Sequence, residues 1–134
     1  MSQQPTGDCY EAALEFFMQA CFGPHWMLEI FNEDIDLEDC PLRLVHAEVV
    51  GQGRLDGVRY GHAFVLDPEK RVVHERAMGR ELVIPQRYYY QLGQIDDSPE
   101  AQEALKYIEY DAEETLRMLR EFKHYGPWEL ETEL

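Results

Sequence analysis

The chain has 134 residues, 45% of them hydrophobic, which is enough for one folded domain with a single core. It carries 27 acidic and 12 basic residues, and its longest basic run is Lys70-Arg71, so the composition argues against a nucleic-acid-binding protein. No apolar run approaches the roughly 20 residues that span a bilayer, and no secretory signal is visible, so we expect a cytoplasmic protein without membrane contact.

The first predicted element is a helix over residues 8–21. Asp8 can accept from the free N–H groups of the first turn, and Glu11 completes an Asp-x-x-Glu capping box. Phe22-Gly23-Pro24 is a helix-ending signal. Apolar residues at spacings of three and four predict one buried face, made of Cys9, Ala12, Ala13, Phe16, Phe17, Ala20 and Cys21.

Cys9 falls in the first turn of this helix. The helix dipole there favours an anion, and the thiolate is the form of cysteine that attacks a carbonyl carbon. The other two cysteines are Cys21 and Cys40, and an odd count without a Cys-x-x-Cys spacing argues against a disulfide framework and against a zinc site. We therefore expect Cys21 to be a small core residue and expect no metal.

An acidic segment over residues 32–39 predicts a loop, and a series of strands follows it. Alternation and turn residues predict strands over 42–50, 58–66, 71–76 and 81–84. Asp67-Pro68-Glu69-Lys70 is a turn signal between the second and third of them. The tyrosines at 88–90 follow Pro85 and are expected to close over the sheet as core and rim residues.

The C-terminal third predicts helix. Ser98-Pro99-Glu100 combines a cap with a proline at the first helical position. From Leu105 to Phe122 apolar residues recur at helical spacing, and Gly126-Pro127 ends the pattern. The whole chain, 1–134, is thus predicted to be a single α+β domain: an N-terminal helix on a small antiparallel β-sheet, with a long C-terminal helix.

The predicted hairpin around Asp67 places a carboxylate beside a histidine. If Asp67 and Lys70 flank a two-residue turn, His62 lies directly opposite Glu75, where a carboxylate can orient the imidazole and stabilise its charged form. A shift of one residue places His74 opposite His62 instead. The turn geometry favours Glu75, and both alternatives remain open at this point.

Two short segments resemble the papain-like cysteine hydrolase superfamily, whose order along the chain is Cys at a helix start, His on a strand, then Asp, Asn or Glu on the next strand. Gly7-x-Cys9-Tyr10 matches the family's Gly-x-Cys-aromatic run, and Gln3 stands six residues before the cysteine. Gly61-His62-Ala63-Phe64 is similar to the strand of transglutaminase-like and compact bacterial or phage members. The 52 residues between Cys9 and His62 are too few for a full-length papain.

The resemblance implies a papain-like core and a small hydrolase of the cysteine protease type, acting on an amide, thioester or isopeptide bond of a protein or peptide substrate. Cys9 would be the nucleophile, His62 the general base and then acid, and Glu75 the orienting carboxylate. Gln3, or Gln4 in its place, would donate to the oxyanion together with the Cys9 N–H. No cofactor is implied, and hydrolysis is not separated from acyl transfer.

The alternative from another class is a non-catalytic acidic binding protein that keeps this fold. Taken singly, a cysteine at a helix start and a histidine in a strand are more often structural than catalytic. An acidic decoy for basic proteins is a further, minor reading of the net charge of −15. Rapid alkylation of Cys9 at mildly acidic pH is the observation that separates the enzyme from the binding protein. The oligomeric state is not predicted.

Overall fold

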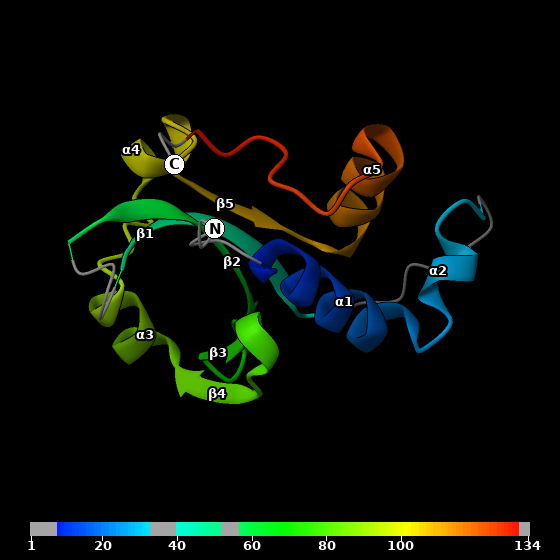
Figure 1. Ribbon diagram of the computed structural model, residues 1–134, viewed down its shortest axis with the longest axis horizontal. Helices are drawn as coiled ribbons and strands as arrows, with labels where there is room; N and C mark the ends of the chain where they lie inside the picture. Colours follow the sequence, from blue (N-terminus) through cyan, green and yellow to red (C-terminus); the bar gives the residue numbers. More distant parts are fainter. Residues whose placement is uncertain (1–7, 33–39, 52–56, 132–134) are drawn as a thin grey trace, which may run out of the picture.

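The computed structural model describes residues 8–32, 40–51 and 57–131 (Figure 1). It confirms the α+β class, with an N-terminal helix, a five-stranded antiparallel sheet and a C-terminal helix. The elements are α1 (Cys9–Phe22), α2 (Trp26–Glu29), β1 (Arg43–Val50), β2 (Arg59–Asp67), β3 (Val72–Glu75), η2 (Ala77–Gly79), β4 (Leu82–Pro85), α3 (Gln86–Leu92), α4 (Pro99–Glu103), β5 (Tyr107–Tyr110) and α5 (Ala112–Phe122). Within these residues no helix has the length and apolar character needed to cross a membrane.

The sheet has the strand order β4-β3-β2-β1-β5, and helices cover both of its faces. Helices α1 and α5 pack on one face, in a core that includes Leu44, Ala63 and Val65. Helices α3 and α4 pack on the other face through Tyr90 and Ala101. Figure 1 shows the two pairs of helices on opposite sides of the strands. The alternation of side chains along β1 and β2 produces this division, because neighbouring residues point to opposite faces.

The first helix is confirmed in extent, but its buried face is rotated from the expected one. The buried residues are Cys9, Tyr10, Ala13, Leu14, Phe17 and Met18. Ala20 is exposed and Phe16 is half-buried. Apolar residues occupy almost the whole circumference of this helix, so spacing alone does not single out the side that the sheet covers. Gly23 ends the helix with φ 90°, and its N–H donates to Gln19 O.

The prediction of one long C-terminal helix is wrong in its first half, where the structure has a short helix and then a strand. Ser98 caps α4 as expected, since its side chain accepts from Ala101 N at 3.1 Å, but that helix stops at Glu103. Strand β5 then pairs antiparallel with β1 and forms an edge of the sheet. Helix α5 starts afresh at a complete capping box, in which Asp111 and Glu114 each bind the other's backbone N–H.

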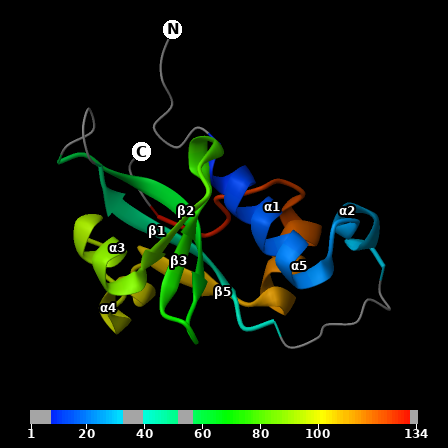
Figure 2. The ribbon, with the colours of Figure 1, turned by 90° about the horizontal axis from the view of Figure 1, so that it is seen from below.

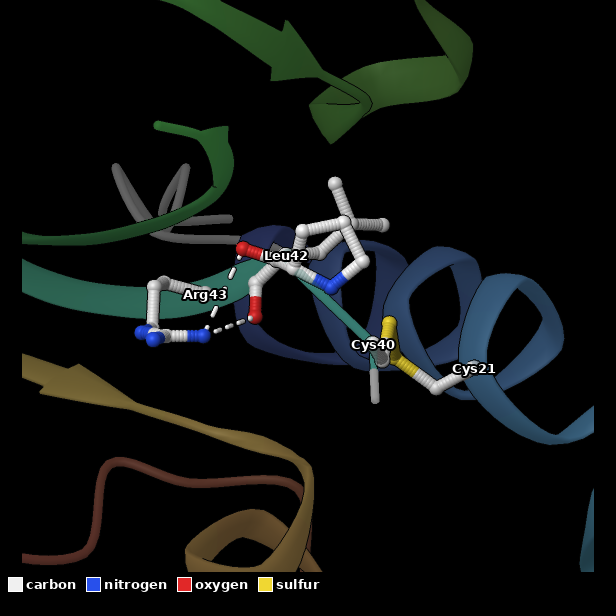
Figure 3. Close-up of a disulfide and its surroundings, with 5 residues drawn as sticks. Cys21, Cys40, Leu42 and Arg43 are labelled. Carbon is white, nitrogen blue, oxygen red and sulfur yellow. Dashed lines mark hydrogen bonds between the residues drawn. A yellow bond between two sulfur atoms is a disulfide. The ribbon is translucent and has the colours of Figure 1, made fainter. Parts of the chain in front are cut away.

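The expectation for the cysteines is also wrong, because Cys21 and Cys40 form a disulfide (Figure 3). Their Cα atoms lie 5.5 Å apart, within the usual range for a bridge. The bond joins the last turn of α1 to the residues that lead into β1, where the guanidinium of Arg43 donates to the carbonyl of Leu42. Cys9 is the free cysteine.

Candidate active site

Cys9 is the first residue of α1, as the sequence predicts, and its side chain lies inside the protein with 1% of its surface exposed. The first helical N–H with an acceptor in the described part of the chain is that of Ala12, which donates to Asp8 O at 2.8 Å. The N–H groups of Cys9, Tyr10 and Glu11 precede it at the positive end of the helix dipole. The thiol therefore sits where a developing negative charge is stabilised.

Asp8 does not cap the helix through its side chain, so the predicted capping box is wrong. Its carboxylate instead accepts from the backbone N–H of Met78, 70 residues further along the chain, at 2.9 Å. Met78 belongs to the short turn η2, which follows directly after Glu75 and Arg76. This hydrogen bond fastens the start of α1 beside the end of β3.

His62 lies on β2, where the third strand no longer covers the edge. The β2–β3 ladder pairs Val65 with His74, Leu66 with Val73 and Asp67 with Val72, and the part of β2 that holds His62 lies beyond it. The start of α1 and the turn η2 occupy this position (Figure 2). The sheet therefore leaves open the edge at which a helix N-terminus can meet the histidine.

Glu75 binds His62 as expected. The Nε2 atom of His62 and the Oε1 atom of Glu75 lie 2.8 Å apart, and both residues are buried. The same oxygen accepts a hydrogen bond from the hydroxyl of Tyr89 on α3, and Oε2 accepts from the N–H of Ala77 at 2.9 Å. Three donors from three elements thus fix the carboxylate, so it can hold the imidazole in one orientation.

The charges of this pair support each other. Burial alone lowers the pKa of His62, but its interactions with Cys9 and Glu75, including attraction to their negative charges, outweigh this effect and raise this pKa to about 9. Burial raises the pKa of Glu75, and His62, Tyr89 and Ala77 outweigh it and lower this pKa to about 2. Near neutral pH the structure therefore holds an imidazolium against a carboxylate.

The other ring nitrogen of His62 is the one available to Cys9. Nδ1 is buried, and no donor–acceptor pair within the described residues meets full hydrogen-bond geometry at this atom. Cys9 is among the groups that raise the pKa of His62, and it follows Asp8, which binds the turn η2 beside the end of β3. His62 thus binds a carboxylate through one ring nitrogen and has the other nitrogen available for a thiol at the start of α1, an order that a cysteine nucleophile and its base would need.

His74, the competing candidate, lies on the opposite face of the sheet. Its ring packs on Phe16 of α1, with ring centroids 4.8 Å apart, and it has no part in the contacts of Glu75. Gln3 and Gln4, the predicted oxyanion donors, lie outside the described residues. Tyr89 is the contributor that sequence reasoning missed: the tyrosine run was expected over the sheet, but nothing in it marked one hydroxyl for Glu75.

A cavity of the described surface lies away from these residues. It measures about 390 Å³ and is lined by Glu48, Arg59, Gln94, Asp96 and Lys106, among others. Glu48 pairs there with Arg59 at 3.7 Å and with Lys106 at 3.6 Å, so its charge is already matched. In the described ranges no three His, Cys, Asp or Glu side chains come together as a metal site. Cys9, His62 and Glu75 therefore remain the candidate catalytic groups among the described residues.

Comparisons with family models, with curated proteins and with solved structures return no match to this chain.

Proposed function

We propose that the protein is a small cysteine hydrolase of the papain-like superfamily, with Cys9 as nucleophile, His62 as general base and acid, and Glu75 as the residue that orients the imidazole. The observation that supports the proposal most is the environment of His62. It is buried and bound to Glu75 at 2.8 Å, and Cys9, the only free thiol of the described residues, is among the groups that raise its pKa. Cys–His catalysis needs this arrangement.

The reaction follows from the order of these groups. The Cys9 thiolate attacks the carbonyl carbon of an amide, thioester or isopeptide bond, and the negative oxygen faces the free N–H groups at the start of α1. His62 gives its proton to the leaving group as the bond breaks, which leaves an acyl group on the sulfur. Water, deprotonated by His62, then releases the acid and restores the thiol; an amine in its place gives acyl transfer.

The second candidate is a non-catalytic acidic binding protein with the same fold. One observation favours it: Cys9 is 1% exposed, and a substrate carbonyl must reach the sulfur. If Cys9 is a nucleophile, the residues that cover its sulfur must move aside when a substrate binds. If Cys9 is structural, its sulfur stays buried and unreactive. Reactivity of the thiol therefore decides between the two.

The test is alkylation of Cys9 by iodoacetamide between pH 5 and pH 9, followed by mass spectrometry of the labelled peptide. We expect labelling at pH 6, well below the range in which an ordinary thiol, with a pKa of about 8.5, reacts. His62→Ala should move the profile of rate against pH upward, because the imidazolium no longer stabilises the thiolate. His74→Ala is the matched control, since this histidine lies on the other face and should leave the profile in place.

Two outcomes would count against the proposal. An inert Cys9 at pH 6 in the folded protein would favour the binding protein. A profile that His62→Ala leaves unmoved would show that the two residues do not act together.

A cytoplasmic location is part of the proposal, and the Cys21–Cys40 disulfide opposes it, because disulfides persist mainly in oxidising compartments. Alkylation of free thiols in fresh lysate of the native host tests this point. Three labelled cysteines would support the cytoplasm, and one labelled cysteine would overturn it.

A further inference from the structure

Strand β4 is an edge strand whose apolar side chains are open on both faces of the sheet. Leu82 is 45% exposed and Val83, which points to the other face, is 61% exposed. An edge strand in an antiparallel sheet ordinarily buries one of its two faces against the core. Here the edge adds little to the core, although its sequence, Leu82-Val83-Ile84-Pro85, is apolar throughout.

The backbone of β4 has an N–H and a C=O group that do not pair with β3. Gln86 N donates to Arg71 O at 2.9 Å, in the same register that pairs Ile84 with Val73 and Leu82 with Glu75. Because hydrogen-bonded pairs alternate along an antiparallel ladder, the N–H and C=O of Val83 point away from β3. Within the described residues neither group has a partner. Val83 can therefore donate to and accept from one residue of an added strand.

This edge is continuous with the candidate active site. Leu82 pairs with Glu75, the residue that binds His62. Between them the chain passes through Met78, whose N–H binds Asp8 next to Cys9. Met78 has φ 60°, a left-handed conformation that is uncommon outside glycine, and its side chain is 70% exposed. The segment 78–83 leads from the start of α1 to the open edge, with exposed apolar side chains at both of its ends and the charged Arg80 and Glu81 between them.

We propose that β4 binds the substrate as an extended peptide strand, which pairs with Val83 and directs its acyl carbon toward Cys9. The inference rests on the proposed function and narrows it to one substrate class: polypeptide segments without fixed structure that carry apolar side chains. Main-chain hydrogen bonds to the edge supply affinity, and contacts with Leu82 and Val83 supply preference. A second copy of the chain is the less favoured occupant, because each copy carries a net charge of −15.

The experiment compares two chloromethyl ketones with the same C-terminal leucine, one an acetylated tetrapeptide of valine and leucine and the other acetyl-leucine alone. In both, the Cys9 thiolate displaces chloride and forms a thioether with the methylene carbon. We expect the tetrapeptide to react at least about tenfold faster at limiting concentration, as two or more added hydrogen bonds would give. Iodoacetamide, which has no peptide part, reports the intrinsic reactivity of Cys9.

Two variants of one residue test the edge. Val83→Pro removes the outward N–H without removing a hydrogen bond of the β3–β4 ladder, and proline is tolerated on edge strands. Val83→Thr keeps the N–H and almost the same shape. We expect Val83→Pro to lose most of the tenfold advantage while its melting temperature and its rate with iodoacetamide stay unchanged, and we expect Val83→Thr to keep the advantage.

The outcomes separate this inference from the proposed function. Equal rates for the two peptides, with rapid iodoacetamide labelling, would overturn the role of β4 and leave the hydrolase standing. An advantage that Val83→Pro retains would overturn it as well. A dimer in light scattering that Val83→Pro dissociates would assign the edge to a second copy instead. Absence of iodoacetamide labelling would reject the proposed function itself.

Discussion

His62 and Glu75 form their 2.8 Å contact diagonally across the sheet rather than from directly opposed positions. The β2–β3 ladder ends with Val65 opposite His74, so the same register would place Phe64, not His62, opposite Glu75. A glutamate side chain is long enough to reach a diagonal neighbour two residues away on the same face. The predicted partners are therefore correct, and the predicted register is wrong by two residues.

The turn explains the difference. Asp67 accepts from the N–H groups of both Glu69 and Lys70 at 3.1 Å, and Arg71 adopts a left-handed φ of 58°. The loop between the strands thus has four residues, 68–71, instead of two. Because a shift of two residues preserves the face on which each side chain lies, Glu75 stays with His62. A shift of one would have exchanged Glu75 for His74.

Tyr89→Phe should weaken the site without removing any of its three main residues. The hydroxyl of Tyr89 donates to the oxygen of Glu75 that binds His62. Its loss removes a hydrogen bond to a buried carboxylate, which typically costs about 1.5–3 kcal/mol of stability. It should also free the carboxylate to rotate, so that the Cys9 alkylation profile moves upward in pH, in the direction of His62→Ala but less far.

The matched control for this prediction is Tyr90→Phe. Tyr90 is the next residue on α3, and its hydroxyl is hydrogen-bonded to that of Tyr107, away from Glu75. We expect a loss of stability of about 1 kcal/mol and an unchanged alkylation profile. Equal shifts in the two variants would mean that Tyr89 acts only through the packing of α3.

The sequence predicted most of the fold where local signals and tertiary contacts agree. Helix α1, strands β1 to β4 and the start of α4 lie within about two residues of their expected places. Strand β5 was missed because Leu105, Ile108 and Ala112 continue the helical spacing of the apolar residues that follow them. In the structure Tyr107 is buried on one face of the sheet and Tyr110 on the other, which stabilises a strand rather than a helix. This burial requires pairing with β1, a tertiary contact that the local sequence does not reveal.

The contact between His62 and Glu75 was predictable from the sequence, but the other connections of the candidate site were not. Cys9, His62 and Glu75 each carried a local signal: a helix start, a Gly-His-Ala-Phe strand and a hairpin turn. The bonds from Asp8 to Met78 and from Tyr89 to Glu75 join residues 70 and 14 positions apart, on elements whose placement no local pattern encodes. The Cys21–Cys40 disulfide was not predicted for the same reason, because its formation depends on the path of the segment between the two cysteines.

Reduction of the disulfide should destabilise the protein and leave the site working. The bridge spans 19 positions, and closing a loop of this size is worth about 3 kcal/mol. We expect dithiothreitol to lower the urea midpoint of the wild type and to have no effect on a Cys21→Ser/Cys40→Ser variant. The labelling rate of Cys9 should be the same in both. Three free thiols in the unreduced, denatured wild type would contradict the bridge.

Leu116→Ala should show that α5 is a structural helix. Leu116 is 2% exposed and packs in the core with α1. Removing its buried methyl groups typically costs about 2–5 kcal/mol. Arg117→Ala, at an exposed position of the same helix, should change stability by about 0.5 kcal/mol or less. Urea unfolding measures both, and equal losses would mean that the apolar side of α5 does not face the core.

The stability of the protein should depend on pH through the His62–Glu75 pair, with opposite signs on the two sides of neutrality. Folding raises the pKa of His62 from 6.5 to about 9, so its contribution is complete below 6.5 and is lost as the pH rises through 9. Folding lowers the pKa of Glu75 from 4.5 to about 2, so its contribution is complete above 4.5 and is lost as the pH falls through 2. Stabilisation by the pair is therefore greatest between pH 4.5 and 6.5.

The alkaline side offers the cleaner measurement, because few other groups titrate between pH 6.5 and 9.5. From urea unfolding at several pH values we expect the wild type to lose on the order of 3 kcal/mol across this range. His62→Gln, which cannot be protonated, should be less stable at pH 6 and should change little up to pH 9.5. The difference between the two proteins reports His62 together with the Cys9 thiol, because the proposed thiolate depends on the imidazolium. If both lose stability equally, the imidazolium does not stabilise the fold, and the charge assignment at the site is wrong.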